Sequence, residues 1–346
     1  MNKRNDMIVE WVVKKIEKEY KDDVSMLLTY GSYENGTANS LSDVDFYFIP
    51  KTEKAYKLCK TFIVEGIGFD LFPMSWKRVE GLAELNESLT PCLANVKVLY
   101  CNSEEDKIKF EELQNRLNIN LYNKVFMLDK SSKQVEMAMK FYCTMLFKED
   151  ICELRRLAGY IAMSLSDAVA YANQTYFSRG LKKQIEDLKN MESTPHDFVL
   201  LYESVIEMNS EPAIKECCYK MIKNTKNFLD RKTEKLIKVE NKANYEELAE
   251  LYEEIISTWN KIKVCCDSGD AVLAYISGTC LQNTLDMASR ENGLDKFNLM
   301  GAYDSKHLER FKERAVNLQK EFVKLIEENG VNIEEYNTVE DFINKN

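Results

Sequence analysis

The strongest constraint on the fold lies in the first fifty residues, where two apolar runs flank a polar loop. The first run covers residues 24–30 and ends in a Gly-Ser turn, and the second covers residues 46–49. Apolar runs of this length, separated by a glycine turn, are typical of two buried strands. Asp43 and Asp45 stand where the second run begins. Because side chains alternate along a strand, we expect both carboxylates on one face of the sheet.

These residue types have the chemistry of a nucleotide site. Two carboxylates on one face offer oxygen ligands to a divalent cation, and the turn at Gly31 and Ser32 lets a phosphate approach the backbone closely. A third acid, Asp70, stands alone in a later apolar run, where an ionised carboxylate is costly unless it is paired. A metal ion shared with Asp43 and Asp45 would pair it. The alternative is a solvent-facing residue at a sheet edge.

The order of these elements resembles the nucleotidyltransferase superfamily related to DNA polymerase beta, over the N-terminal third of the chain. The resemblance implies a metal-dependent transfer of a nucleoside monophosphate from a triphosphate, ATP in the first instance, to a hydroxyl group, with release of pyrophosphate. It implies that Asp43, Asp45 and Asp70 are catalytic and bind Mg²⁺, close enough together to share ions. It also implies that Gly31 and Ser32 bind the nucleotide phosphates.

Within the superfamily, the sequence around these motifs is similar to that of the antibiotic nucleotidyltransferases, which act on aminoglycosides and lincosamides. That branch implies a helical C-terminal domain that shapes a pocket for a small acceptor, and a helical-domain carboxylate that can act as general base. We expect the acceptor to bind between residues 1–120 and the later helices. Five acids in the first of those helices are candidates for the base, and no motif selects among them: Glu136, Glu149, Asp150, Glu153 and Asp167.

The apolar patterns predict an α+β fold with two domains. Strands are predicted at 24–30, 44–49, 67–72 and 95–100, with helices at 5–20, 52–64, 76–86 and 103–117. After that the strand signal ends, and long helical patterns continue at 131–148, 150–173, 213–238, 244–264, 270–289 and 304–328. We therefore predict a nucleotidyltransferase catalytic domain at 1–120 and a helical substrate-binding domain at 121–346.

Net charge, hydropathy and cysteine content limit the classes of partner and the cellular location that we expect. The net charge of −10 argues against a nucleic-acid partner, and no apolar run has the length of a membrane span. Ten scattered cysteines without a C-x-x-C pair favour reduced thiols in a cytoplasmic protein. Two alternatives stay open: nucleotidylation of a protein or RNA end, and a non-catalytic nucleotide-binding module. The acceptor, the nucleotide base, the general base and the oligomeric state are left open.

Overall fold

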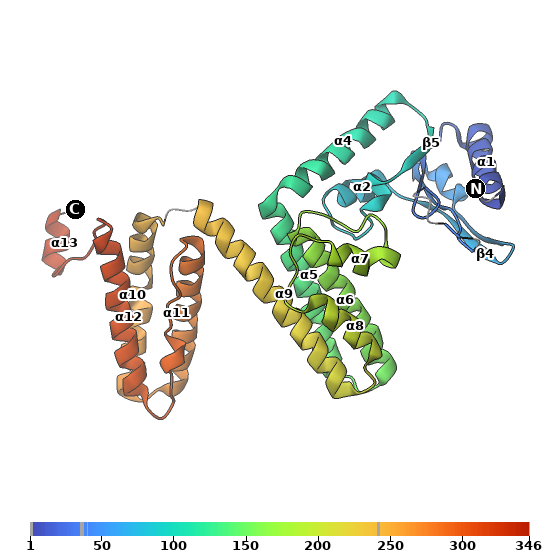
Figure 1. Cartoon of the computed structure of the whole chain (residues 1–346). Helices are drawn as coiled ribbons and strands as arrows, with labels where there is room; N and C mark the ends of the chain where they lie inside the picture. Colours follow the sequence, from blue (N-terminus) through green and yellow to red (C-terminus); the bar gives the residue numbers. More distant parts are fainter. Residues whose placement is uncertain (1–2, 35–37, 40, 241–242, 346) are drawn as a thin grey trace. The chain divides into compact units, whose positions relative to one another are not determined.

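The structure is a computed structural model that describes residues 3–34, 38–39, 41–240 and 243–345 (Figure 1). The backbone divides into two compact units, Met1–Lys232 and Thr233–Asn346. The division falls within the long helix α9 (Glu211–Glu240). The functional boundary predicted near residue 120 lies inside the first unit and stays a prediction.

The first unit begins with a five-stranded mixed sheet and its helices, followed by helices alone. The sheet region contains α1 (Lys3–Lys15), a π-helical turn η1 (Ile16–Tyr20), β1 (Val24–Tyr30), β2 (Asp45–Pro50), a 3₁₀ helix η2 (Glu53–Leu58), β3 (Lys60–Val64), β4 (Ile67–Pro73), α2 (Trp76–Ala83), α3 (Pro91–Ala94), β5 (Lys97–Cys101) and α4 (Glu104–Tyr122). The helices that follow are α5 (Lys124–Leu146), α6 (Ile151–Ala172), the 3₁₀ helix η3 (Leu181–Lys183), α7 (Gln184–Lys189), α8 (Phe198–Glu207) and α9 (Glu211–Glu240). This sequence of elements confirms the α+β prediction.

The sheet has the strand order β3-β4-β2-β1-β5. All neighbours are antiparallel except β2 and β4, which run parallel with Phe46 beside Leu71. Tyr30 is the register partner of Asp45 at the end of the β1–β2 pair. The register therefore brings the glycine turn after β1 to the beginning of β2.

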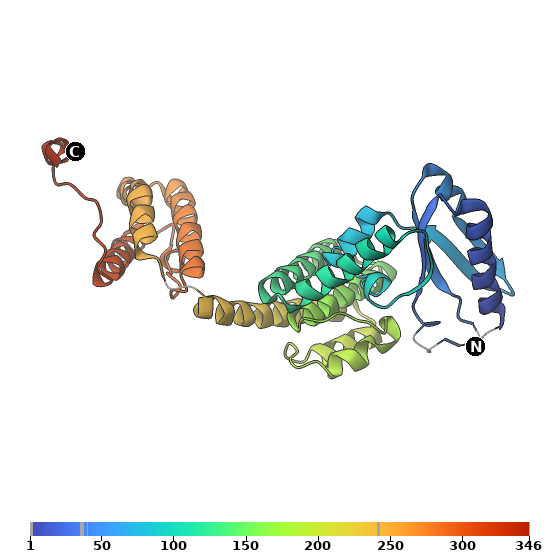
Figure 2. The ribbon, with the colours of Figure 1, turned by 90° about the horizontal axis from the view of Figure 1, so that it is seen from above.

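Both faces of the sheet are buried, which explains why its central strands read as continuous apolar runs rather than alternating ones. One face packs Phe46 and Phe48 against Val12 and Ile16 of α1 and η1. The other face packs residues such as Tyr47 against α2, α3 and α4. Figure 2 shows α1 and these helices on opposite sides of the sheet.

The helix predicted at 52–64 is wrong in its second half, because that segment forms η2 and then the edge strand β3. Phe62 of β3 stacks on Phe69 of β4 with ring centroids 5.5 Å apart. The two strands meet in a tight turn at Glu65 and Gly66, which both have positive φ, as a type I′ hairpin turn requires. The pairing with β4 outweighs the weak helical pattern.

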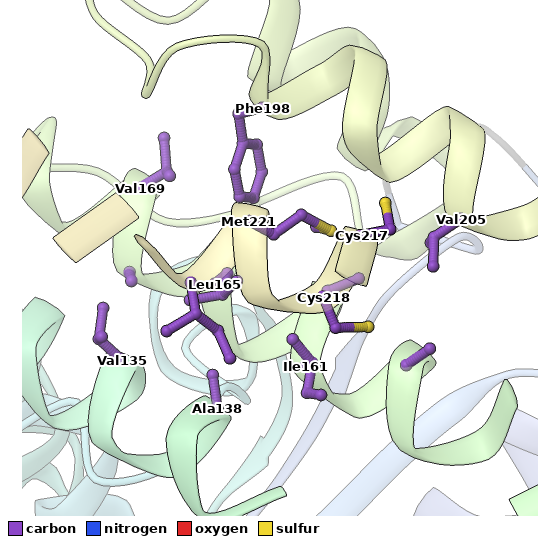
Figure 3. Packing of buried hydrophobic residues seen from close by; sticks show 14 of the residues in the cluster. Val135, Ala138, Ile161, Leu165, Val169, Phe198, Val205, Cys217, Cys218 and Met221 are labelled. Atoms are coloured by element: carbon purple, nitrogen blue, oxygen red, sulfur yellow. The ribbon is translucent and has the colours of Figure 1, made fainter. Parts of the chain in front are cut away.

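The helices of the first unit share one apolar core, part of which Figure 3 shows. Leu165 of α6 lies in it together with Val135 of α5, Phe198 of α8 and Met221 of α9. The helices predicted from the sequence do not include α7 or α8.

The second unit packs three long helices around one core: α10 (Tyr245–Ser268), α11 (Ala271–Glu291) and α12 (Leu308–Glu328). A 3₁₀ helix, η4 (Met300–Ala302), lies between α11 and α12, and the short helix α13 (Val339–Lys345) ends the unit. Trp259, Phe311 and Phe322 are fully buried in this core. Among the described residues, no helix is long and apolar enough to span a membrane.

We expect Phe322→Ala to destabilise the second unit by about 3–5 kcal/mol, because it removes a buried ring and leaves a cavity. Phe322 contacts Phe297 edge-on at 5.3 Å between centroids. Urea denaturation of the full chain measures the change. Ile343→Ala, at a side chain 66 % exposed on α13, is the control and should stay within about 0.5 kcal/mol of the parent protein.

Candidate active site

The turn after β1 lies directly against the carboxylate at the start of β2. Gly31 has φ +78°, and a Cβ at this position would lie 2.2 Å from Oδ2 of Asp45. A side chain at this position would strain the backbone and would displace the Asp45 carboxylate. The turn backbone and the Asp45 carboxylate thus form one surface.

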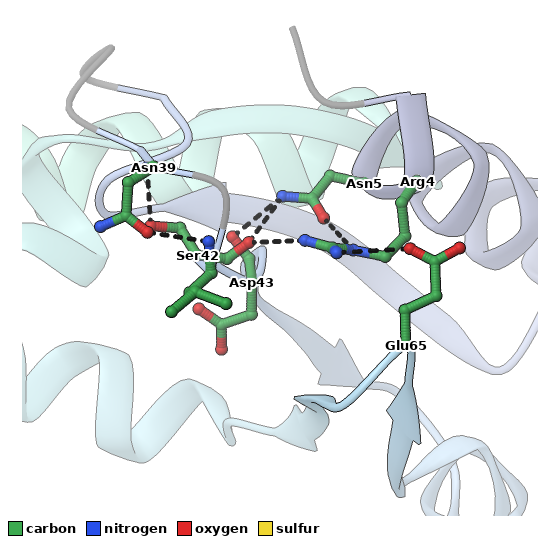
Figure 4. A network of polar contacts seen from close by, with 7 residues as sticks. Arg4, Asn5, Asn39, Ser42, Asp43 and Glu65 are labelled. Carbon is green, nitrogen blue, oxygen red and sulfur yellow. Dashed lines mark hydrogen bonds and ion pairs between the residues drawn. The ribbon is translucent and has the colours of Figure 1, made fainter.

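The loop that carries Asp43 is tied to the start of α1 (Figure 4). Asn5 is fully buried, and its amide nitrogen donates to the backbone carbonyls of Ser42 at 3.1 Å and Asp43 at 3.2 Å. Arg4 adds a third bond, from its guanidinium to the Ser42 carbonyl at 3.2 Å. Val44, between the two acids, is buried in the core. Because Val44 points to the α1 side of the sheet, Asp43 and Asp45 lie on the opposite side, that of Tyr47.

Asp43 and Asp45 interact electrostatically. Burial raises the pKa of Asp45 to about 6, and repulsion from the Asp43 carboxylate adds to the increase. The ammonium group of Lys182, in η3, lowers the same pKa and offsets part of the effect. A half-buried carboxylate beside a second carboxylate is a donor set that suits a divalent cation, which would supply the missing positive charge.

Asp70 lies on β4, the strand parallel to β2. Because Phe46 pairs with Leu71, the positions before them, Asp45 and Asp70, are also neighbours on one face. The Asp70 carboxylate is exposed and accepts a hydrogen bond of 2.9 Å from the Thr61 hydroxyl on β3. Within residues 3–34, 38–39, 41–240 and 243–345, no three His, Cys, Asp or Glu side chains are assembled to hold a metal. The structure thus brings Asp43 and Asp45 together, while the Asp70 carboxylate is bonded to Thr61. That the three acids share metal ions stays a prediction.

Comparison with known families agrees with this geometry: residues 9–119 match the family model of the nucleotidyltransferase domain. This region is a nucleotidyltransferase domain. The superfamily resemblance is confirmed, and the chain is a transferase enzyme. No curated protein matches the chain.

The nucleotidyltransferase domain is in contact with the helices that follow it. Tyr171 of α6 is buried in the core between the sheet and α2–α4. The side-chain amide of Gln174, just beyond α6, donates to the carbonyls of Leu121 and Tyr122 at 3.0 and 2.9 Å. The C-terminal half of α6 therefore packs against the nucleotidyltransferase domain.

Asp167 is the one acid among the five candidates that is half-buried and lies at this contact. The Ser88 hydroxyl, in the loop after α2, donates to it at 2.6 Å. Burial raises the pKa of Asp167 to about 6, and the Ser88 hydrogen bond opposes the increase. Such a value suits a group that exchanges a proton near neutral pH.

The other four acids have surface roles, which separates them from Asp167. Asp150 caps α6 by accepting from the Glu153 amide at 2.9 Å, and Glu153 forms an ion pair with Lys148 at 3.0 Å. Glu136 and Glu149 are exposed.

Gly31→Ala should abolish divalent-metal binding, since the new methyl group would displace the Asp45 carboxylate. Calorimetry with Mn²⁺ measures this. Gly66→Ala is the matched control, because Gly66 has φ +77° but nothing within 4 Å of its Cβ position. Both variants carry the backbone strain, about 1 kcal/mol or more of stability. Equal metal affinity in the two would show that the contact with Asp45 does not matter.

The raised pKa of Asp45 predicts how stability depends on pH in metal-free protein. The folded state binds the proton more tightly than the unfolded chain, so stability increases as pH falls from 7 through about 6. Asp45→Asn should therefore raise Tm by about 2–4 °C at pH 7.5 with chelator, roughly 1 kcal/mol, and flatten the pH dependence. Asp70→Asn, at an exposed carboxylate, is the control. A lower Tm for Asp45→Asn would contradict this interpretation.

Proposed function

We propose that this enzyme transfers a nucleoside monophosphate from a triphosphate, ATP in the first instance, to a hydroxyl group of a small molecule. The observation that carries the proposal is the close packing of the Gly31 turn against Asp45, with Asp43 beside it, inside a domain of the nucleotidyltransferase family. A phosphate chain on the turn would lie next to both carboxylates.

Each part of the site has a task in this proposal. The amides of the Gly31-Ser32 turn and the Ser32 hydroxyl bind the terminal phosphates, and Lys182 adds a positive charge beside them. Asp43 and Asp45 hold Mg²⁺, and Asp70 joins them when its side chain turns from Thr61. Bound Mg²⁺ supplies charge neutralisation for the triphosphate and the departing pyrophosphate.

The acceptor hydroxyl attacks the α-phosphorus, a new P–O bond forms, and the bond to the bridging oxygen of pyrophosphate breaks. The proton of the hydroxyl moves to Asp167, which Ser88 orients and whose raised pKa makes it a competent base near neutral pH. The acceptor binds where α6 meets the loop that carries Ser88.

An aminoglycoside or lincosamide is the acceptor we propose to test first, which would make the enzyme an antibiotic-resistance factor. The support is the sequence similarity to that branch and the net charge of −10, which suits a cationic acceptor. A cytoplasmic location belongs to the same proposal, because all ten cysteines are free thiols.

The direct assay incubates the enzyme with each labelled triphosphate and a panel of aminoglycosides and lincosamides, and looks for a mass gain of one nucleoside monophosphate. Transfer to a protein or RNA end instead of any small molecule would favour the first alternative. Nucleotide binding without turnover at saturating Mg²⁺ would favour a non-catalytic module.

Mg²⁺ should increase triphosphate affinity, and Asp43→Asn should remove most of that increase, because the cation links the carboxylates to the phosphates. Calorimetry with and without Mg²⁺ tests both statements. Asp129→Asn is the control, since Asp129 forms an exposed ion pair with Lys133 on α5. The same affinity with and without Mg²⁺ in the parent enzyme would count decisively against a metal-linked triphosphate.

Asp167→Asn should lower kcat by about 10²–10⁴-fold, the range for loss of a general base, while triphosphate affinity stays within about twofold. Single-turnover kinetics with the identified acceptor measures the chemical step. Glu153→Gln, at the far end of α6, is the control. If Asp167 and the other four acids can each be replaced without effect on turnover, the acceptor site lies elsewhere.

A further inference from the structure

The loop that joins α2 to α3, residues 84–90, brings the Ser88 hydroxyl to Asp167 on α6, where it donates at 2.6 Å. Its backbone is not an ordinary turn. Leu85 has φ +51° and is buried, with 2 % of its surface exposed. A leucine adopts this left-handed conformation only where the surrounding structure enforces it, and such strain is common at functional sites. We call residues 84–90 the α2–α3 loop.

The α2–α3 loop is attached to its surroundings on both sides of Ser88. Before it, the Asn86 side-chain oxygen accepts from the ammonium group of Lys130 on α5 at 2.8 Å. After it, in α3, the Cys92 carbonyl accepts from the Tyr47 hydroxyl on β2 at 2.6 Å. The loop therefore connects the sheet with the helices that follow the nucleotidyltransferase domain.

The attachment to the sheet lies beside the acid pair. Tyr47 is two positions after Asp45 on β2, so both residues are on the same face of the sheet. Tyr30, the register partner of Asp45, is hydrogen-bonded through its hydroxyl to the Cys92 thiol. The loop thus ends next to the strand that carries Asp45 and contacts Asp167 through Ser88, which fixes the proposed base relative to the acid pair.

A bidentate ion pair holds the residue directly before Ser88. Nε and Nη2 of Arg78 on α2 donate to the two carboxylate oxygens of Glu87, each at 2.8 Å. Two parallel bonds of this kind fix orientation as well as distance. The side chains are 39 and 34 % exposed, so the pair is partly shielded from water. The hydrogen bonds from Arg78 also lower the pKa of Glu87, which keeps its carboxylate ionised near neutral pH.

We propose that Arg78 and Glu87 are positioning residues: their ion pair holds the Ser88 hydroxyl, and through it the Asp167 carboxylate, where the acceptor hydroxyl loses its proton. The inference rests on the proposed function, in which Asp167 is the general base. A base must lie within hydrogen-bond reach of the proton that it removes, and a displacement of about 1 Å can cost roughly 100-fold in rate. An ion pair without this role would add little even to stability, and kcat would not depend on it.

Thermal melts of the metal-free full chain test the link from Glu87 to Asp167 without any acceptor. Because burial raises the pKa of Asp167 to about 6, Asp167→Asn should raise Tm at a pH above that value. Ser88→Ala should enlarge this gain, because the Ser88 hydrogen bond opposes the increase in pKa. Glu87→Gln should enlarge it in the same way. A gain in Glu87→Gln that equals the parent value would overturn the proposal.

Kinetics with ATP, Mg²⁺ and the aminoglycoside or lincosamide that gains a nucleoside monophosphate tests the catalytic effect. Glu87→Gln removes the charge, and Arg78→Lys keeps the charge but loses the two parallel bonds. Each should lower kcat about tenfold or more, while triphosphate affinity stays within about twofold. Glu80→Gln is the matched control, because Glu80 on α2 forms an ion pair of similar exposure with Lys109 on α4. If Glu87→Gln is as harmless as this control, the proposal is wrong.

Two further readouts show whether the effect passes through Ser88. The double variant Ser88→Ala/Glu87→Gln should have a kcat within about twofold of the slower single variant, and effects that multiply would count against the ion pair. The acid limb of the pH profile of kcat should move to higher pH in both single variants, because the pKa of Asp167 increases. Tyr171 and Tyr202 beside Asp167 stay neutral in this range, since burial raises the pKa of both. A limb that moves in Ser88→Ala and not in Glu87→Gln contradicts the proposal.

The positioning role and the proposed function fail in different ways. An Asp167→Asn variant with the kcat of the parent enzyme would show that the proposed base itself is wrong. A slow Asp167→Asn together with an unimpaired Glu87→Gln would show that the base is right and that the ion pair does not position it. Circular dichroism melts confirm that each variant folds.

Discussion

The contact between the Gly31 backbone and the Asp45 carboxylate is the constraint on which the rest of the site depends. It exists because β1 and β2 pair with Tyr30 opposite Asp45, so the strand register alone brings the turn to the acid. The contact has a cost, since it half-buries a carboxylate next to a second one. Two carboxylates so placed repel each other, and a divalent cation would offset that repulsion.

Much of this arrangement follows from local sequence patterns. The alternation of Asp43, Val44 and Asp45 predicts the common orientation of the two acids, and the buried Val44 explains it. The glycine that ends an apolar run predicts the turn. Caps were equally predictable: the Ser103 hydroxyl accepts from the Asp106 amide at 3.1 Å at the start of α4. Each of these inferences needs only residues close together in the chain.

The remainder of the site depends on contacts between distant residues. The hydroxyl that donates to Asp70 belongs to Thr61, which lies on a strand that the sequence pattern assigns to a helix. The Asn5 amide donates hydrogen bonds to the carbonyls of Ser42 and Asp43, which lie 37 and 38 positions later in the chain. Ser88 and Asp167 are 79 positions apart. The periodicity of a single segment cannot predict such pairs, because they form only when separate elements pack together.

The bonds from α1 to the Asp43 loop carry a consequence for how this enzyme can be handled. The core contacts of α1 come from Ile8 and Val12, whereas the bonds to the loop come from Arg4 and Asn5 in its first turn. Fraying of that turn would leave the sheet packed and release two backbone carbonyls beside the acidic pair. A fusion partner or trimmed start at this end therefore acts on the loop that carries Asp43, although the primary sequence gives no hint of the connection. For purification tags, the C-terminal end is the safer choice.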